Sequence, residues 1–308
     1  MSLVIHLKSA RRGWWQSHLQ SLLPEIKCLL WEEVTDTDDV RYAVVWKPPT
    51  GGLATFKNLQ CIVSVGAGID HVLADHELPT HVPIIRTTGS ELTQRMCEYV
   101  CMHVLIQHRQ LMRMLQAQHS QQWAPVITPT AANRTVGVMG LGKLGRSAVE
   151  SLLTLGFNVV GWARSEHHIT GVTCYCEAQL PEFLRQTNIL VCLLPLTEAT
   201  SNILNNSLFG QLPAGAALIN AGRGEHLQEQ DLITALDSSH LSHATLDVFR
   251  TEPLPVEHPF WHHPKITVTP HIASMIDPES GGKEIARNLR AFINGESIED
   301  LTDRTRGY

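Results

Sequence analysis

The sequence predicts an α/β protein with two doubly wound parallel sheets and a cleft between them. Short apolar runs alternate with helical patterns along nearly the whole chain, which is typical of buried parallel strands joined by crossover helices. The alternation is interrupted by one long helical segment and then starts again. The length of 308 residues also fits two domains better than one.

The first third of the chain contains apolar runs that are too short to be helices. Each run is bounded by turn residues or charged residues, so we expect a buried strand at each. The runs are Val4–Leu7, Cys28–Trp31, Ala43–Trp46, Ile62–Val65 and Ile84–Ile85. A long helical pattern follows from Glu91 to Gln122 and stops near Trp123. Such a segment could link two domains or pack against a partner chain.

The alternation of strands and helices is more pronounced in the rest of the chain. Its apolar runs are again separated by helical patterns and turn residues. The predicted strands are Thr135–Met139, Asn158–Trp162, Val172–Cys176, Ile189–Leu193, Ala217–Asn220, Ala244–Val248 and Ile266–Thr269. The last helical pattern, Gly282–Asn294, ends at Gly295, a residue type common at helix C-termini. We therefore expect a second parallel sheet in this part.

The composition excludes several classes of protein. Hydrophobic residues make up 43% of the chain and charged residues 18%, which is typical of a globular protein. The net charge of -6 and the lack of a basic run argue against a nucleic-acid partner. No run approaches the roughly 18 apolar residues of a membrane span, and the N-terminus predicts a strand rather than a signal peptide. Seven cysteines without framework or zinc spacing predict reduced thiols, a cytoplasmic location and no metal site.

One predicted strand–helix turn carries glycines at the spacing of a dinucleotide-binding motif. The pattern G-x-G-x-x-G falls on Gly140, Gly142 and Gly145, between the strand that ends at Met139 and the helical run Ser147–Leu155. The first glycine permits a tight turn, the second lets the backbone approach a pyrophosphate, and the third lets the helix pack on the strand. The N–H groups at the helix start favour phosphate. The alternative is an ordinary glycine-rich turn.

The residues after the next strand bear on the choice of nicotinamide cofactor. NAD enzymes commonly carry Asp or Glu there, which binds the ribose 2′-hydroxyl. This chain has Arg164 and Ser165 instead, and a guanidinium and a hydroxyl suit a 2′-phosphate. We therefore expect NADPH (NADP+), with NADH possible but less favoured. The alternative is a solvated loop arginine.

Three polar residues follow late strands, where ligands of doubly wound sheets bind. Arg223 lies between two glycines, and Glu252 and His271 lie in loops further along. Together they suffice for ketone reduction, because histidine can protonate a developing alkoxide, a carboxylate can orient it, and a guanidinium can hold a substrate carboxylate and polarise its carbonyl. Singly, each could be an ordinary surface or ion-pair residue.

Taken together, the motifs resemble those of the D-isomer-specific 2-hydroxyacid dehydrogenases, and within that family the bacterial glyoxylate/hydroxypyruvate reductases of the A type. The resemblance covers essentially the whole chain. Besides the glycine turn, it rests on Val65–Asp70, Trp162–Ser165, Leu193–Pro195, Ala221–Gly224, Leu246–Phe249, Glu252–Pro255, Thr269–Ala273 and the tail Asp303–Tyr308. One such motif alone is weak, whereas the combination is specific.

The resemblance implies two Rossmann-like domains of the formate/glycerate dehydrogenase type. Residues 1–93 with 275–308 would form a flavodoxin-like substrate domain, and residues 94–274 the dinucleotide-binding domain. The implied reaction is the NADPH-dependent reduction of small 2-oxo acids, glyoxylate to glycolate and hydroxypyruvate to D-glycerate. The family's catalytic Arg, Glu and His fall on Arg223, Glu252 and His271. The implied cofactor-binding residues are Gly140, Leu141, Gly142, Lys143, Leu144, Gly145, Arg164, Ser165, Leu194, Pro195, Ala221, Gly222 and Asp247.

Further residues are expected to bind the substrate, in addition to Arg223 and His271. The turn Gly66–Ala67–Gly68 bares backbone N–H groups that could hold a small carboxylate; a plain tight turn is the alternative. In the family, a tryptophan at the position of Trp46 belongs to a loop that covers the substrate, which would leave room for short 2-oxo acids. Otherwise Trp46 is an exposed aromatic at a strand end.

The family also implies a homodimer, joined through the cofactor domain and the long helix. Two other functions remain open. One is a nucleotide-sensing, corepressor-like binding protein on the same fold, against which the short chain and Arg164 argue. The other is a different D-2-hydroxyacid dehydrogenase.

Overall fold

The protein consists of two compact units. Unit 1 comprises Met1–Leu92 and Met275–Tyr308, and unit 2 comprises Thr93–Ser274. The structure, a computed structural model, describes residues 1–7 and 10–302. The predicted tail motif at 303–308 therefore lies outside the described residues. Each unit is built on its own parallel sheet.

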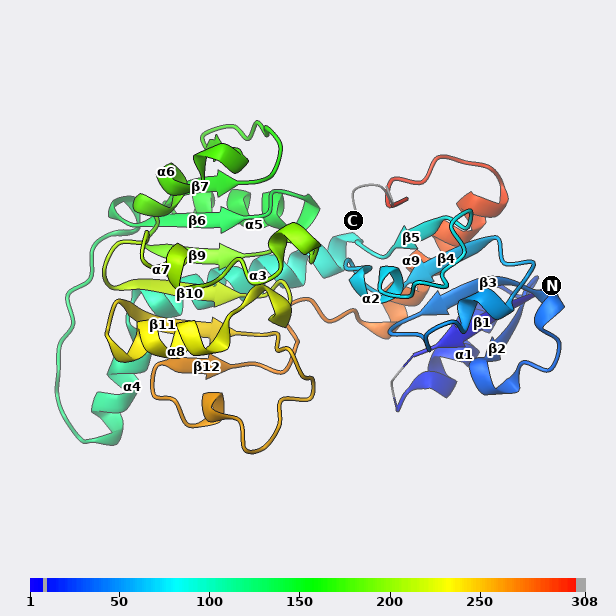
Figure 1. Cartoon of the computed structure of the whole chain (residues 1–308), viewed down its shortest axis with the longest axis horizontal. Helices are drawn as coiled ribbons and strands as arrows, with labels where there is room; N and C mark the ends of the chain where they lie inside the picture. Colours follow the sequence, from blue (N-terminus) through cyan, green and yellow to red (C-terminus); the bar gives the residue numbers. More distant parts are fainter. Residues whose placement is uncertain (8–9, 303–308) are drawn as a thin grey trace. The chain divides into compact units, whose positions relative to one another are not determined.

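Unit 1 has a 5-stranded sheet in the order β2-β1-β3-β4-β5 (Figure 1). This is the flavodoxin-like order of a doubly wound fold, and every neighbouring pair is parallel. The strands are β1 (Ser2–His6), β2 (Lys27–Leu30), β3 (Val40–Val45), β4 (Cys61–Ser64) and β5 (Ile84–Arg86). The helices are α1 (Arg12–Leu22), α2 (Asp70–Leu73) and α9 (Pro278–Ile293), with short 3₁₀ turns at Trp31–Glu33, Thr37–Asp39 and Leu53–Thr55.

Both faces of this sheet are covered. Side chains alternate along β1, so that Leu3 and Ile5 pack with α1 and α9 through residues such as Leu19 and Leu289. Val4 belongs to a separate core on the other face. The fully buried strand residues explain why the sequence shows continuous apolar runs instead of alternation.

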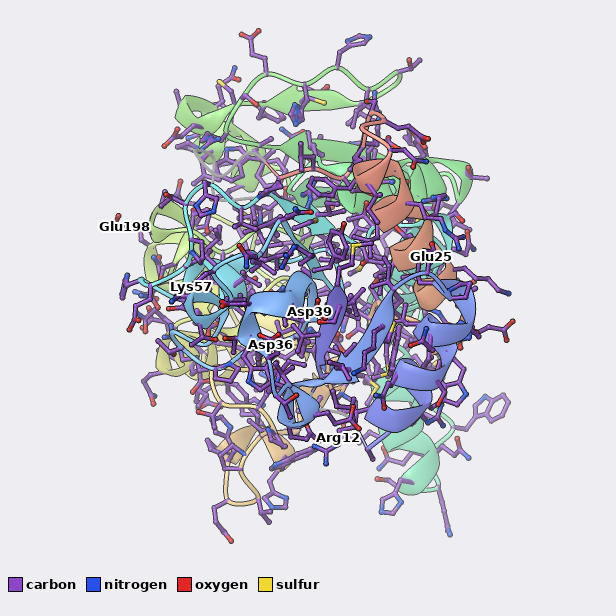
Figure 2. All side chains as sticks on the ribbon, turned by 90° about the vertical axis from the view of Figure 1, so that its right-hand side faces the viewer. Arg12, Glu25, Asp36, Asp39, Lys57 and Glu198 are labelled. Atoms are coloured by element: carbon purple, nitrogen blue, oxygen red, sulfur yellow. The ribbon has the colours of Figure 1, made fainter. Side chains whose placement is uncertain are left out.

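Helix α9 begins earlier than the predicted Gly282. Its first residue is Pro278, and the Asp277 carboxylate caps the helix by accepting the N–H groups of Glu279 and Ser280 at 3.0 and 3.1 Å. Near its other end, α9 is tied to the segment after α1. Arg290 Nε donates to Glu25 Oε1 at 3.1 Å. Figure 2 shows Glu25 just beyond one end of α1 and Arg12 at the other end.

Unit 2 has a 7-stranded sheet in the order β12-β11-β10-β9-β6-β7-β8 (Figure 1), again wholly parallel. The strands are β6 (Thr135–Met139), β7 (Asn158–Trp162), β8 (Thr173–Tyr175), β9 (Ile189–Cys192), β10 (Ala216–Asn220), β11 (Leu241–Leu246) and β12 (Ile266–Val268). The helices are α4 (Leu111–His119), α5 (Lys143–Thr154), α6 (Leu180–Arg185), α7 (Asn206–Phe209) and α8 (Glu229–Asp237), preceded by α3 (Ser90–His108). Short 3₁₀ turns lie at Ala131–Asn133, Glu177–Gln179, Glu198–Thr200, Gly224–His226 and Pro259–Trp261.

Helices cover both faces of this sheet as well. Figure 1 shows α8 in front of the strands and α3 behind them. The front core contains Phe183 of α6, Phe209 of α7 and Leu236 of α8, all fully buried. The rear core contains Val104 of α3 and Leu152 of α5. The predicted fold class, two parallel α/β sheets, is confirmed.

The prediction of one continuous helix from Glu91 to Gln122 is wrong, because two helices, α3 and α4, occupy this segment. Helix α3 ends at His108, and α4 starts after Gln110, which has a left-handed backbone with φ 53°. That conformation breaks the helical path. Within the part of the chain that the structure describes, no helix is long and apolar enough to cross a membrane.

Candidate functional site

The predicted catalytic and cofactor-binding residues of unit 2 share one edge of its sheet. All seven strands are parallel, so their carboxyl ends lie at the same edge. The glycine turn follows β6, and its neighbour β9 runs into Leu194 and Pro195. The strand order reverses between these two strands. Such a switch point is where doubly wound sheets bind ligands.

The glycine turn needs glycine for measurable reasons. Gly140 has φ +98°, and a Cβ there would lie 2.6 Å from the carbonyl oxygen of Leu193. A Cβ on Gly145 would lie 1.8 Å from the carbonyl oxygen of Gly140. Both distances are below any real contact, so larger residues would push α5 away from the sheet.

The start of α5 suits a phosphate group. Gly142 is the N-cap residue and has no side chain that could cap the N–H groups of the first turn, which contains Lys143 and Leu144. A Cβ on Gly142 would meet no atom of the described residues within 4 Å. Backbone donors therefore border open space at the positive end of a helix of 12 residues. This geometry fits the pyrophosphate of a dinucleotide.

Arg164 and Ser165 follow β7 and are exposed. The end of β7 adjoins the glycine turn, because Gly140 N–H donates to the carbonyl oxygen of Trp162 at 2.8 Å. Arg146 of α5 holds the same loop through the carbonyl oxygen of His168 at 2.8 Å. The loop that bears the guanidinium is thus anchored beside the glycine turn.

His271 and Glu252 form a hydrogen-bonded pair. His271 Nδ1 lies 3.0 Å from both carboxylate oxygens of Glu252, and the two side chains are 33% and 21% exposed. A carboxylate only accepts, so Nδ1 carries the proton. Glu252 is itself held by the N–H of Phe249, which donates to Oε1 at 3.2 Å.

The backbone of His271 is held in an unusual conformation. Its φ of 53° lies in the left-handed region, which is costly for a residue with a Cβ. Its N–H donates to the carbonyl oxygen of Asp247 at 2.9 Å. The buried Asp247 carboxylate also accepts the next two N–H groups, from Ile272 at 2.9 Å and Ala273 at 2.8 Å. Asp247 therefore positions the histidine loop, and its predicted contact with the cofactor remains a prediction.

A chain of hydroxyl groups extends from Asp247 to α3. Thr269 Oγ1 donates its single proton to Asp247 Oδ1 at 2.6 Å. The Tyr99 hydroxyl lies 2.7 Å from Thr269 Oγ1 and must therefore be the donor in that second contact. Burial raises the pKa of Tyr99, as does the nearby negative charge of Asp247. The Tyr99 phenol thus keeps the proton that it donates to Thr269 Oγ1.

The Arg223 loop joins the same edge. Gly222 N–H donates to Asn220 Oδ1 at 3.2 Å, and Asn220 Nδ2 donates to the carbonyl oxygen of Arg223 at 3.1 Å. Asp247 N–H donates to the carbonyl oxygen of Asn220 at 3.0 Å. A Cβ on Gly224 would lie 2.0 Å from the carbonyl carbon of Phe249. The loop of Arg223 is therefore packed against the segment that carries Glu252.

Unit 1 brings its own predicted residues together. Trp46 follows β3 and the turn Gly66–Ala67–Gly68 follows β4, a neighbouring parallel strand. Gly66 has φ +130°, and a Cβ there would lie 3.2 Å from the Trp46 ring. The ring also packs on His71, with centroids 4.3 Å apart. His71 was not singled out from the sequence.

Metal binding has no support in the residues that the structure describes, where no group of three or more His, Cys, Asp or Glu side chains could hold an ion. Each of the seven cysteines is a free thiol. Burial raises the pKa of several of them, to about 11 for Cys28 and about 12 for Cys61. Cys28 and Cys61 are therefore poor nucleophiles and poor metal ligands.

The seven-stranded sheet, its switch point and its glycine turn define an α/β protein of the dinucleotide-binding class. Residues 101–273 match the NAD-binding domain of the D-isomer specific 2-hydroxyacid dehydrogenases. A glyoxylate/hydroxypyruvate reductase A from Yersinia enterocolitica is 39% identical over 300 residues, which cover 96% of each chain. The chain belongs to the D-isomer specific 2-hydroxyacid dehydrogenase family, as the sequence motifs predict.

Solved structures of the family are similar over the full length. A D-isomer specific 2-hydroxyacid dehydrogenase from Xanthobacter autotrophicus Py2, in complex with NADPH and MES, has a TM-score of 0.93 at 38% identity, covering 100% of this chain and 99% of that one. The NADPH-dependent glyoxylate/hydroxypyruvate reductase of Sinorhizobium meliloti, in complex with NADP and sulfate, has a TM-score of 0.93 at 37% identity, covering 100% of both chains.

Proposed function

We propose that this protein is an NADPH-dependent reductase of short 2-oxo acids, converting glyoxylate to glycolate and hydroxypyruvate to D-glycerate. The observation that carries the proposal is the His271–Glu252 pair on the edge of a dinucleotide-type sheet that also bears Arg223. The names of the similar reductases from Yersinia enterocolitica and Sinorhizobium meliloti support it.

In the proposed mechanism, the glycine turn and Arg164 would hold NADPH, which would supply the hydride that reduces the carbonyl carbon of the substrate. His271, protonated on both ring nitrogens, donates the Nε2 proton to the carbonyl oxygen, which becomes the hydroxyl of the product. Glu252 holds the ring through Nδ1 and stabilises its charged form. Arg223 binds the substrate carboxylate and polarises the carbonyl.

The experiment is a spectroscopic assay of NADPH oxidation with glyoxylate, hydroxypyruvate and pyruvate as substrates. We expect oxidation with the first two acids and a lower kcat/KM with pyruvate. If NADPH binds but none of the acids is reduced, the reductase proposal is wrong and the corepressor-like binding protein becomes the better reading.

Cofactor choice gives a first prediction. Replacing Arg164 with alanine is expected to raise KM for NADPH and leave KM for NADH nearly unchanged, because only NADPH carries the 2′-phosphate. The measurement is kcat/KM for both cofactors in the wild type and the variant. Arg185→Ala, which removes an exposed arginine paired with Glu182 at 3.2 Å, is the matched control. A wild-type preference for NADH contradicts the assignment.

We also assign NADPH to unit 2 and substrate contacts to Trp46 and Gly66–Ala67–Gly68 of unit 1. Replacing Trp46 with alanine is expected to raise kcat/KM for a longer 2-oxo acid, such as 2-oxobutanoate, relative to glyoxylate, because the ring limits the space. Trp31→Ala is the control, since Trp31 packs instead on Phe56 and His6. An unchanged ratio of the two kcat/KM values rules out this role of Trp46.

We further propose a homodimer that forms through α3 and α4. Large apolar side chains are exposed there, namely Met102, Leu105, Leu111, Met112, Met114 and Leu115. Such a surface is typical of an interface. Sedimentation velocity is expected to give twice the mass of the chain for the wild type and for the control Val256→Arg, which is 83% exposed elsewhere. The double variant Met102→Arg with Leu115→Arg should be monomeric; a monomeric wild type refutes the proposal.

The location of the protein is the remaining proposal. We propose that it works in the cytoplasm, because free thiols on all seven cysteines suit a reducing compartment.

A further inference from the structure

His226 is a fully buried histidine that the proposed mechanism does not use. It lies three residues after Arg223, in the 3₁₀ turn Gly224–His226, and its exposed fraction is 0%. A polar ring in such a place must have its two nitrogens matched to specific partners, since unmatched buried polar groups are costly.

The first ring nitrogen faces the Arg223 loop. The backbone N–H of Arg223 donates to His226 Nδ1 at 3.0 Å. A Cβ on Gly222 would lie 2.8 Å from Nδ1, so the glycine lets the backbone approach the ring this closely. Cys192 Sγ lies 3.9 Å from the same nitrogen, and burial raises the pKa of this thiol to about 12. The thiol therefore keeps its proton, and the backbone N–H of Arg223 is the close donor to the single lone pair of Nδ1.

The second ring nitrogen faces the loop after β9. His226 Nε2 lies 3.3 Å from the carbonyl oxygen of Pro195, which also accepts from Thr200 Oγ1 at 2.7 Å. A carbonyl oxygen can only accept, so Nε2 carries the ring proton. The contacts at the two nitrogens thus agree on one neutral tautomer, with Nδ1 as acceptor and Nε2–H as donor.

We propose that His226 is a positioning residue that links the loop of Arg223 to the loop of Leu194 and Pro195 through its two ring nitrogens. The proposal rests on the proposed function, in which the first loop binds the 2-oxo acid and the second contacts NADPH. The ring therefore couples the position of the loop of Arg223 to the position of the loop of Leu194 and Pro195. It touches neither ligand in this role.

Two single variants separate the two links. His226→Asn places an amide oxygen near the position of Nδ1 and keeps the acceptor for Arg223 N–H, but it is too short to reach Pro195. His226→Gln places an amide nitrogen near the position of Nε2 and keeps the donor to Pro195, but loses the acceptor. His226→Leu removes both links.

The measurements are kcat and KM for glyoxylate, and the Kd of NADPH from quenching of protein fluorescence without substrate. For His226→Asn we expect the Kd of NADPH to rise about three- to tenfold, the worth of one hydrogen bond, with KM for glyoxylate close to that of the wild type. For His226→Gln we expect the reverse, a raised KM for glyoxylate and a lowered kcat with little change in Kd. His226→Leu should show both changes.

A melting temperature for each variant and the control His240→Asn complete the experiment. His240 lies at the amino end of β11, where its Nε2 contacts the carbonyl oxygen of Phe209 at 2.8 Å. The positioning role is wrong if the His226 variants lower only the melting temperature and change no kinetic or binding constant. It is also wrong if His226→Asn and His226→Gln change kcat, KM for glyoxylate and the Kd of NADPH equally. Should the wild type reduce no 2-oxo acid, the proposed function fails, while the Kd of NADPH in His226→Asn still tests the link to Pro195.

Discussion

Replacing His271 with alanine is expected to lower kcat for glyoxylate reduction by about 10²–10⁴-fold, the usual worth of a general acid. The physical reason is that the alkoxide formed by hydride transfer would have to take its proton from water. The fold should persist, because His271 is partly exposed. Its loop is held by the N–H groups of Ile272 and Ala273, which donate to the Asp247 carboxylate. The measurements are steady-state kinetics and a melting curve.

Two further variants test the assignment of His271. His262→Ala removes an exposed histidine from the loop before β12 and should leave kcat unchanged. Glu252→Gln keeps an acceptor for Nδ1 but removes the charge that stabilises the imidazolium, so a smaller loss of kcat than in His271→Ala is expected. Full turnover by His271→Ala would show that another group supplies the proton.

The sequence was a good guide to the strands of unit 2 and a weaker guide to the helix boundaries. The predicted bounds of β6 and β7 agree with the structure, because apolar runs between turn residues leave few alternatives. The break at Gln110 has no Gly or Pro to mark it, since a single residue adopts the left-handed conformation. The start of α9 was masked by Gly281 and Gly282, although the Asp277–Pro278 pair marks a helix start.

The positions of the candidate site residues were predictable where these residues follow strands and carry the family's motifs. Arg223, Glu252 and His271 lie in three loops of one sheet edge, as expected for a doubly wound fold. The roles of Asp247, Tyr99 and His226 could not be read from spacing. Tyr99 meets Thr269 across 170 residues of sequence, and the tautomer of His226 depends on carbonyl and N–H groups from separate loops. Such contacts exist only after the sheet has formed.

Replacing Arg223 with alanine is expected to raise KM for glyoxylate and to lower kcat by about 10²–10³-fold, the cost of losing a donor aimed at developing charge. Both constants should change, because the guanidinium binds the carboxylate in the ground state and polarises the carbonyl in the transition state. The Kd of NADPH should stay near the wild-type value. The measurements are steady-state kinetics and fluorescence titration with NADPH.

Arg223→Lys distinguishes the geometry of the guanidinium from its charge. Arg223 Nη1 donates to the carbonyl oxygen of Gly222 at 2.8 Å, and the planar guanidinium has further N–H donors for a bidentate contact with a carboxylate. Lysine keeps the charge and loses the fork, so we expect it to recover part of the KM and little of the kcat. Full recovery by lysine would mean that charge alone suffices. A variant Arg223→Ala with unchanged KM would remove this arginine from the substrate site, because a bound carboxylate cannot lose its cation without losing affinity.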